Sequence, residues 1–148
     1  WTMRPIGYLH TPYSDTQQVP KGLGAQHTAE GVLEILPEYG AGLLDIEGFS
    51  HLVVIWIFDR AQGYELVVTP PCDDRPHGVF ATRAPRRPNP IGLTVVELVW
   101  REGWSLHLRG VDMLDGTPVL DLKPYTSSVA MEQLRRGWLA AAEERSHE

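Results

Sequence analysis

One short stretch of the sequence concentrates arginine and proline. Residues 78–92 read GVFATRAPRRPNPIG, with three arginines and three prolines between two glycines. Each proline fixes φ and removes a backbone N–H donor, so the segment cannot lie inside a sheet and forms a stiff, extended loop. A guanidinium on such a loop is preorganised to bind a carboxylate or a phosphate. The stretch therefore predicts the wall of a ligand site, against the alternative of a rigid surface loop with solvated arginines. The polar side chains that it would present are Thr82, Arg83, Arg86, Arg87 and Asn89.

A second stretch, residues 112–125 (DMLDGTPVLDLKPY), gathers acidic side chains. Its charged and aromatic members are Asp112, Asp115, Asp121, Lys123 and Tyr125. A carboxylate can act as a general base, whereas an aspartate followed by glycine is also a strong turn signal. Both roles stay open for Asp115. Hard metal ions prefer oxygen ligands, but the spacing matches no calcium-binding loop, and we expect no metal site.

A third stretch, residues 19–27 (VPKGLGAQH), contains two glycines next to Lys21. A dinucleotide-binding loop needs G-x-G-x-x-G between a strand and a helix, and here His27 takes the place of the third glycine. The pattern therefore argues against a Rossmann fold. It predicts a mobile glycine-rich flap that offers Lys21 to an anion.

The remaining reactive side chains form no known catalytic motif. Cys72 is the single cysteine, so neither an intrachain disulfide nor a cysteine metal cluster is possible. Four histidines are scattered along the chain without metal-ligand spacing, namely His10, His51, His77 and His107. No G-x-S-x-G sequence indicates a serine nucleophile.

Length and composition place the chain among ordinary globular proteins. With 148 residues, 43% of them hydrophobic, we expect one domain over residues 1–148. The longest apolar run, Leu52 to Phe58, is too short to cross a bilayer, and the first residues lack the apolar core of a signal peptide. We therefore expect a cytoplasmic protein without a membrane partner. The net charge of −6 argues against broad nucleic-acid wrapping but leaves room for a local basic patch around residues 75–87.

Short strand-like runs separated by glycine and proline dominate the chain. We expect strands at residues 6–10, 31–36, 52–58, 64–69, 93–100, 104–111 and 119–122, with a hairpin turn at 101–103. So many short strands with few helices predict a mainly β fold, namely a single small β-barrel. A short helix is expected within 37–44. An amphipathic C-terminal helix over 129–145, with Leu134, Trp138 and Ala142 at helical spacing, is expected to pack on the barrel.

Three blocks of this sequence resemble one known family. Residues 47–58 (EGFSHLVVIWIF), 78–93 (GVFATRAPRRPNPIGL) and 112–125 resemble the TsaA-like family, also called the TrmO family. The likeness extends from about residue 5 to residue 125, with Ala84 where the family usually has serine. Members are S-adenosylmethionine-dependent methyltransferases that act on N6-threonylcarbamoyladenosine in tRNA. The resemblance implies a β-barrel unlike the Rossmann methyltransferases, and a homodimer with the cofactor near the subunit interface.

The resemblance also implies which residues form the site. Cofactor contacts would fall on Pro20, Lys21, Asp59, Arg60, Arg83, Leu93, Asp112, Met113, Leu114 and Asp115. Substrate contacts would fall on Arg86, Arg87, Asn89, Lys123 and Tyr125. An arginine suits the cofactor's carboxylate or that of the threonyl group, and Asp112 or Asp115 is the candidate general base for N6. The anticodon loop of a tRNA would bind through local positive charge and through stacking of a base on Tyr125.

Two other functions remain compatible with the residues. The first is a non-catalytic β-barrel that binds an adenosine-containing ligand, which predicts binding without turnover. The second is a metallohydrolase that uses Asp112, Asp115, Asp121 and a histidine, which predicts activity sensitive to chelators.

Overall fold

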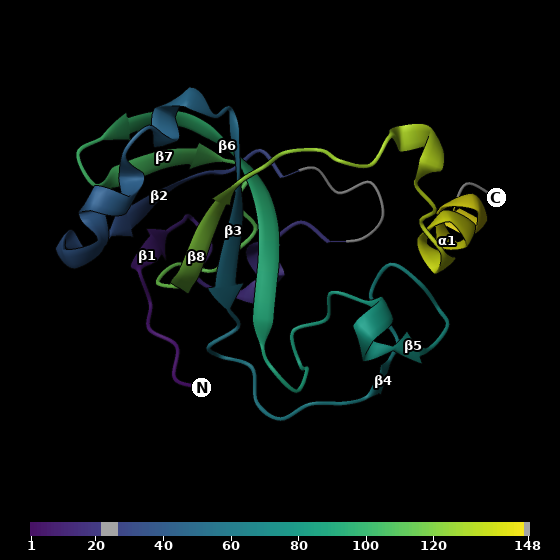
Figure 1. Cartoon of the computed structure of the whole chain (residues 1–148). Coiled ribbons are helices and arrows are strands. Elements are labelled where there is room, and N and C mark those ends of the chain that lie inside the picture. Colours follow the sequence, from purple (N-terminus) through teal and green to yellow (C-terminus); the bar gives the residue numbers. More distant parts are fainter. Residues whose placement is uncertain (22–26, 147–148) are drawn as a thin grey trace.

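Six antiparallel strands close into a barrel in the computed structural model, which describes residues 1–21 and 27–146 (Figure 1). The strands lie in the order β1-β2-β7-β6-β3-β8, and β8 pairs with β1 to close the barrel. Their bounds are β1 (Gly7–His10), β2 (Glu30–Ile35), β3 (His51–Ile57), β6 (Ile91–Glu102), β7 (Ser105–Arg109) and β8 (Pro118–Pro124). The predicted mainly β-barrel fold is thus confirmed, with six strands in the barrel.

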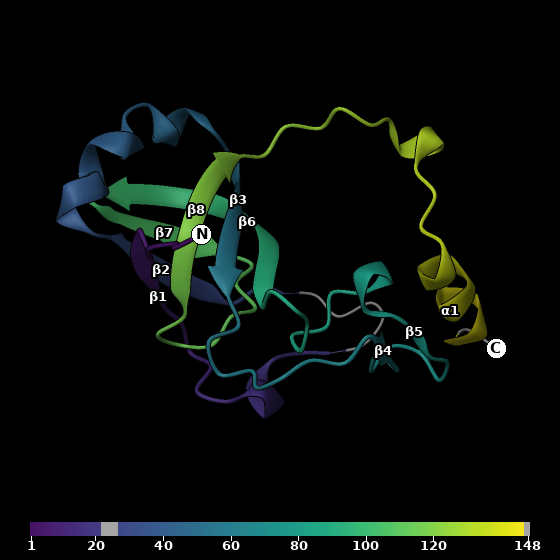
Figure 2. The ribbon, with the colours of Figure 1, turned by 60° about the horizontal axis from the view of Figure 1, so that its bottom comes forward.

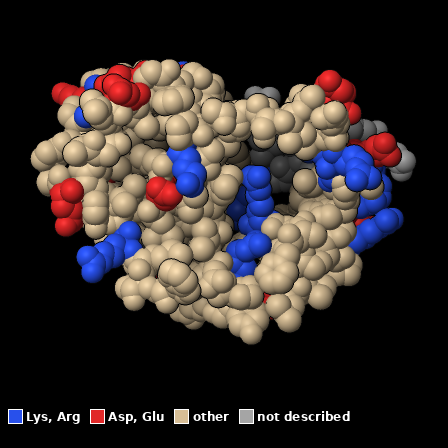
Figure 3. All heavy atoms as spheres, viewed as in Figure 1, with Lys and Arg blue, Asp and Glu red and all other residues tan. Residues whose placement is uncertain are grey.

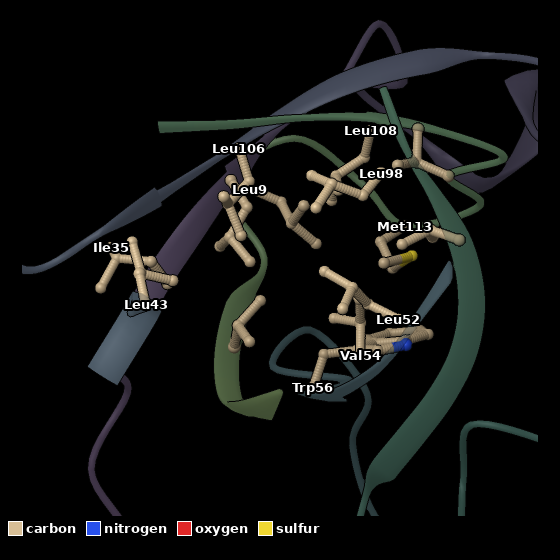
Figure 4. Close-up of a cluster of buried hydrophobic side chains, with 14 residues drawn as sticks. Leu9, Ile35, Leu43, Leu52, Val54, Trp56, Leu98, Leu106, Leu108 and Met113 are labelled. Carbon is tan, nitrogen blue, oxygen red and sulfur yellow. The ribbon is translucent and has the colours of Figure 1, made fainter. Parts of the chain in front are cut away.

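The barrel is filled by side chains that alternate along each strand, as a strand period of two requires. On β3 the inward side chains are Leu52, Val54 and Trp56, which Figure 4 shows together in the buried cluster. The outward side chains of β3 are only partly buried. The apolar run at residues 52–58 therefore combines one core face with one apolar face on the outside of the barrel.

Two glycine turns connect the strands near the predicted positions. Gly103, with φ 59°, turns the chain between β6 and β7. Gly116, with φ 82°, completes the turn that leads from residues 112–115 into β8. Both glycines occupy the left-handed region that other residues rarely adopt, so the backbone of each turn favours the glycine found there.

Between β3 and β6 the chain leaves the barrel, and we call residues 58–90 the insertion (Figure 1). It contains a two-stranded sheet of β4 (Val67–Val68) and β5 (His77–Gly78), followed by a 3-10 turn at Val79–Ala81. The expected barrel strand at 64–69 is wrong in extent and in place. Only two of its residues pair, because β5 is their sole partner strand and Pro70–Pro71 follow directly.

The helical parts of the described residues are short. The expected helix within 37–44 is a 3-10 helix over Pro37–Leu43, and further 3-10 turns lie at Thr16–Gln18, Ile46–Gly48 and Met131–Gln133. In the described part of the chain, no helix has both the length and the apolar character needed to span a membrane.

The C-terminal helix differs from the prediction in length and in packing. Helix α1 covers Trp138–Ser146, not 129–145, because Gly137 adopts φ 55° directly before it. Figure 2 shows α1 beside β4 and β5, away from the barrel. The indole N–H of Trp138 donates to the Ala81 carbonyl at 2.7 Å, and its ring stacks on His77. The helix therefore packs on the insertion rather than on the barrel.

Candidate functional site

Two adjoining cavities lie where the insertion meets the barrel. The large cavity has a volume of about 670 Å³ and the small cavity about 360 Å³. Both volumes fall within the range of about 300–1,000 Å³ that is usual for small-molecule sites. Trp56, Phe58 and Asp112 line both cavities, so the two spaces meet at these three side chains. Figure 3 shows Lys and Arg atoms gathered in the hollow between the barrel and the insertion.

The cavity walls come from three separated parts of the sequence. The large cavity is lined by Thr16, Val19, Lys21, Trp56, Ile57, Phe58, Asp59, Arg60, Ala61, Gln62, Pro85, Arg86, Asp112, Met113, Leu114 and Thr117. The small cavity is lined by Trp56, Phe58, Thr82, Arg83, Arg87, Ile91, Gly92, Leu93 and Asp112. The arginine–proline stretch and the acidic stretch thus both contribute residues to the walls of the two cavities.

An aromatic pair forms the apolar surface that the two cavities share. The rings of Trp56 and Phe58 lie 4.2 Å apart at their centroids, tilted by 58°. Trp56 faces Gly92 across the β3–β6 pairing, and a Cβ on Gly92 would meet the indole at 2.4 Å. Glycine is therefore required at position 92 for the indole to lie flat over β6.

A hydrogen-bonded chain runs from this aromatic pair to Asp112. The indole N–H of Trp56 donates to Thr94 Oγ1 at 3.1 Å, and the Thr94 hydroxyl donates to Asp112 Oδ1 at 2.8 Å. Asp112 Oδ2 has no hydrogen-bond partner among the described residues. The Asp112 carboxylate is thus held by one oxygen, while it lines both cavities.

Five cationic side chains line the two cavities, and they differ in how their charges are balanced. Arg86 pairs with Glu65 at 3.2 Å and donates to the Gln62 carbonyl. Arg87 donates from Nη1 to the carbonyls of Thr82 and Ala84, which ties the loop together but supplies no negative charge. The side chains without any hydrogen bond or ion pair to the described residues are Arg83 and Lys21. Charge is therefore left for an anion at Arg83, Arg87 and Lys21.

Arg60 acts as a structural tie at the edge of the large cavity. Its Nη1 donates to the Ser14 carbonyl at 2.9 Å, and its Nη2 donates to the Asp115 carbonyl at 3.1 Å. The segment after β3 is thereby joined both to the N-terminal loop and to the turn at residues 112–117. Its neighbour Asp59 lines the same cavity.

Asp115 lies apart from the two cavities. Its carboxylate accepts the Thr11 backbone N–H at 3.0 Å and lies 3.9 Å from His10 Nδ1. Asp115 lines neither cavity, so the structure separates it from Asp112 although only two residues lie between them in the sequence. This geometry favours Asp112 as the candidate base and gives Asp115 a role in holding the turn.

The remaining predicted residues are only partly brought together. Arg86 and Arg87 line the cavities, whereas Asn89, Lys123, Tyr125 and Pro20 line neither. Lys123 lies 3.8 Å from Asp121, and the Tyr125 backbone N–H donates to the His51 carbonyl. Both residues lie at the end of β8 opposite the 112–117 turn. Of the predicted flap at 19–27, residues 22–26 lie outside the described part of the chain.

The candidate site also contains residues that the sequence reading did not single out: Trp56, Phe58, Gln62, Gly92, Thr94 and Thr117. Most of them read as ordinary strand residues. The one available signal was Thr94, the polar residue among the buried positions of β6, where a hydroxyl needs a partner.

The three aspartates of the acidic stretch do not converge. Asp112 faces the cavities, Asp115 holds Thr11, and Asp121 lies beside Lys123. Within residues 1–21 and 27–146, no group of three His, Cys, Asp or Glu side chains is arranged to hold a metal ion. The donor set that a metallohydrolase would use is therefore not assembled by these residues.

Comparison with known proteins relates both the sequence and the fold to a single family. Residues 8–131 match the family described as the tRNA-methyltransferase O N-terminal domain. A probable S-adenosyl-L-methionine-binding protein of Pyrococcus abyssi is 50% identical over 137 residues, which cover 92% of this chain and 74% of that protein. The tRNA (adenine(37)-N6)-methyltransferase of Mus musculus is 39% identical over 130 residues, covering 82% of this chain and 30% of the mouse protein.

A solved structure shows the same fold. The crystal structure of TrmO from Pseudomonas aeruginosa superposes with a TM-score of 0.74 at 37% identity. The superposition covers 93% of this chain and 62% of the solved chain. The barrel described above is thus shared with that protein over nearly all of this chain, although this chain spans less than two thirds of the other.

Proposed function

Since the chain belongs to the tRNA-methyltransferase O family, we propose that it methylates N6 of threonylcarbamoyladenosine at position 37 of a tRNA, with S-adenosyl-L-methionine as the methyl donor. The enzyme class and the cofactor agree with the names that its relatives carry. The observation that carries the proposal is the junction of the two cavities. There an aromatic pair and Asp112 line both cavities, and Arg83, which has no partner among the described residues, lines the small one.

The residues at this junction fit the chemical groups of the cofactor. Trp56 and Phe58 offer an apolar, aromatic surface suited to an adenine ring. Arg83 or Lys21 suits the cofactor's carboxylate, because neither cation has a partner among the described residues. Asp112 suits a cationic group. Met113 and Leu114 line the large cavity beside Asp112.

The residues of the chain then have defined tasks in methyl transfer. When bound, the cofactor supplies a methyl group on a sulfonium, and the protein has to hold acceptor and donor in line and away from water. Asp112 is our general base, because its free Oδ2 can accept the proton that leaves N6 when the N–CH₃ bond forms. Trp56, Phe58 and Met113 exclude water from one side.

The choice of a threonylcarbamoyl acceptor is supported by the number of available cations. Cofactor and acceptor each carry one carboxylate. Arg83 and Arg87 both line the small cavity, and neither has a carboxylate partner among the described residues. Within the small cavity, one guanidinium can bind the cofactor's carboxylate and the other the carboxylate of the threonylcarbamoyl group, which an unmodified adenosine lacks.

Recognition of the anticodon loop and assembly as a homodimer complete the proposal. An unpaired loop base can be splayed into a pocket, and the cations gathered in the hollow supply local positive charge on a chain with net charge −6. Arg86 is placed to contact the nucleic-acid backbone at the rim, since it lines the large cavity and is half exposed. A cytoplasmic location remains a prediction.

Calorimetric titration with S-adenosyl-L-methionine tests the cofactor site. We expect the wild-type protein to bind with micromolar affinity and Arg83→Ala to bind about tenfold more weakly, because a carboxylate–guanidinium contact is lost. Arg75→Ala is the matched control, since Arg75 lies on the same insertion but lines neither cavity. Equal affinities for both variants would remove Arg83 from the site.

Transfer assays on tRNA test the acceptor. We expect methyl incorporation into tRNA that carries threonylcarbamoyladenosine at position 37 and none into the same tRNA with unmodified adenosine. Equal incorporation into both would refute the threonylcarbamoyl specificity. Cofactor binding without transfer to either tRNA would favour the alternative of a non-catalytic adenosine-binding barrel.

A further inference from the structure

We propose that Thr94 is a positioning residue for Asp112, which fixes the Asp112 carboxylate so that its Oδ2 faces the junction of the two cavities. This inference rests on the proposed methyl transfer and assigns a role to a residue in the middle of β6. It follows from the direction of two hydrogen bonds and from the burial of the group that makes both.

The directions of the two hydrogen bonds are set by chemistry alone. An indole nitrogen can only donate, so Thr94 Oγ1 has to accept the hydrogen bond from Trp56. The hydroxyl has a single hydrogen, which is therefore directed to Asp112 Oδ1 at 2.8 Å. Oδ1 is thus an acceptor in this arrangement. Oδ2, which has no hydrogen-bond partner among the described residues, is the more available oxygen for a proton from a ligand.

The burial of Thr94 shows that the arrangement is specific. Thr94 is 8% exposed and faces the barrel interior between Gly92 and Val96. A valine would fill the same space, and a buried hydroxyl is costly unless its hydrogen bonds are made. Here both are made, by Trp56 and Asp112. The two hydrogen bonds, to Trp56 and to Asp112, explain why threonine occupies this core position.

The consequence for the site is a carboxylate with one fixed and one available oxygen. Asp112 lines both cavities, so we infer that its Oδ2 is available where a donor and an acceptor molecule would meet. Without the Thr94 hydroxyl the carboxylate can rotate about its Cβ–Cγ bond, and the indole N–H of Trp56 loses its acceptor. Small displacements of a reacting group reduce rates strongly.

The test compares variants at Thr94 in single-turnover methyl transfer to modified tRNA at saturating cofactor. We expect Thr94→Val to lower the rate about tenfold to a hundredfold. We expect Thr94→Ser, which keeps the hydroxyl, to restore most of the rate. Trp56→Phe should cost less than Thr94→Val, since the hydroxyl can still donate to Asp112. Thr69→Val is the matched control, at an exposed position outside both cavities.

A double-mutant cycle separates positioning from a general structural effect. If Thr94 acts through Asp112, then adding Thr94→Val to Asp112→Asn should cause little further loss of rate. Additive losses would show that Thr94 acts independently and would overturn the inference. Thermal unfolding identifies any variant that fails to fold, and in that case Thr94→Ser and Trp56→Phe supply the comparison.

The outcomes also separate this inference from the proposed function. Transfer by the wild-type protein together with an unchanged rate for Thr94→Val would overturn the role of Thr94 and leave the function intact. Absence of transfer by the wild-type protein on modified tRNA would overturn the function, and the inference with it.

Discussion

Asp112 and Asp115 lie three residues apart, yet their carboxylates meet different surroundings. Asp112 accepts the hydroxyl of a buried threonine and lines both cavities. Asp115 accepts a backbone N–H of the N-terminal loop. Gly116, with φ 82°, directly follows Asp115 in the turn that leads into β8. Spacing in sequence alone therefore could not decide which carboxylate belongs to the site.

We predict that Asp115→Ala lowers stability and leaves methyl transfer largely intact. The Thr11 N–H loses its acceptor, and one hydrogen bond to a charged, half-exposed group contributes about 1 kcal/mol. Urea unfolding measures this loss. Asp115→Asn is the control, because its amide oxygen can still accept from Thr11. A large fall in transfer rate for both variants, with stability unchanged, would instead make Asp115 the general base.

At the scale of elements, helix α1 and the insertion form one packed unit beside the barrel. Trp138 contacts Ala81 and His77, and Arg145 forms an ion pair with Asp73 at 2.5 Å. Ala81 directly precedes Thr82 and Arg83, which line the small cavity. Helix α1 therefore helps to fix the wall of the small cavity, because it contacts the residue that leads into Thr82 and Arg83.

Asp73 joins α1 to the insertion through its contacts with Arg145 and His77. Its side chain is 2% exposed and forms a 2.7 Å hydrogen bond with His77 Nε2. The hydrogen bond from His77 and the contact with Arg145 together hold the pKa of Asp73 well below its usual value of 3.8, although burial acts in the opposite direction. A depressed carboxylate pKa stabilises the folded state above the unfolded pKa and ceases to do so as the carboxylate is protonated.

We predict that α1 detaches from the insertion as the pH falls from about 3.8 towards the lowered pKa of Asp73, while the barrel remains folded. The ionised Asp73 stabilises the contact fully above that pH, and its protonation at lower pH removes the interaction with Arg145 and His77. The NMR signal of the Trp138 indole N–H follows the change. Asp73→Asn should release the helix already at neutral pH, whereas Asp74→Asn, at an exposed neighbouring site, should not. Identical titrations for wild type and Asp73→Asn would contradict this account.

Local sequence signals predicted some elements well and others poorly, for identifiable reasons. The strands β3 and β6 could be predicted because they bury every second side chain over much of their length. The two-residue strands β4 and β5 carry no such periodicity. The C-terminal helix was extended too far, because the spacing of Leu134 with Trp138 suits a helix, whereas Gly137 and contacts with distant residues decide its start.

The residues of the candidate site, which come together only in the whole molecule, also differ in whether local sequence could predict them. Arg83 and Asp112 could be predicted, since charged residues in rigid or turn-rich segments are unusual and carry the family resemblance. Thr94 could not be assigned, because threonine is common in strands and its partners are 18 and 38 residues away. Lys123 was predicted as a substrate contact from its motif, but it faces outward on β8 beside Asp121.

The outer surface of the barrel carries an apolar face that crosses β3 and β6. Val53 pairs with Val95, Ile55 with Leu93, and Ile57 with Ile91 in the antiparallel register. We call these six residues the aliphatic face. On β6 its members are 39–45% exposed. On its β8 side, Lys123 pairs with Val53 and Asp121 with Ile55, so two opposite charges border it. A two-fold pairing of copies would place each charge near its opposite.

We predict that this aliphatic face joins two copies of the chain into a homodimer. Covering it removes apolar surface from water, and Leu93 and Ile91 also line the small cavity, so a second copy would lie next to the site. Light scattering should give twice the 16.6 kDa mass of one chain. Val95→Lys, which places a charge in the centre of the face, should give monomers that bind S-adenosyl-L-methionine more weakly. Leu44→Lys, at an exposed apolar position elsewhere, should remain dimeric. A monomeric wild-type protein, or a dimeric Val95→Lys variant, would show that the face serves another purpose.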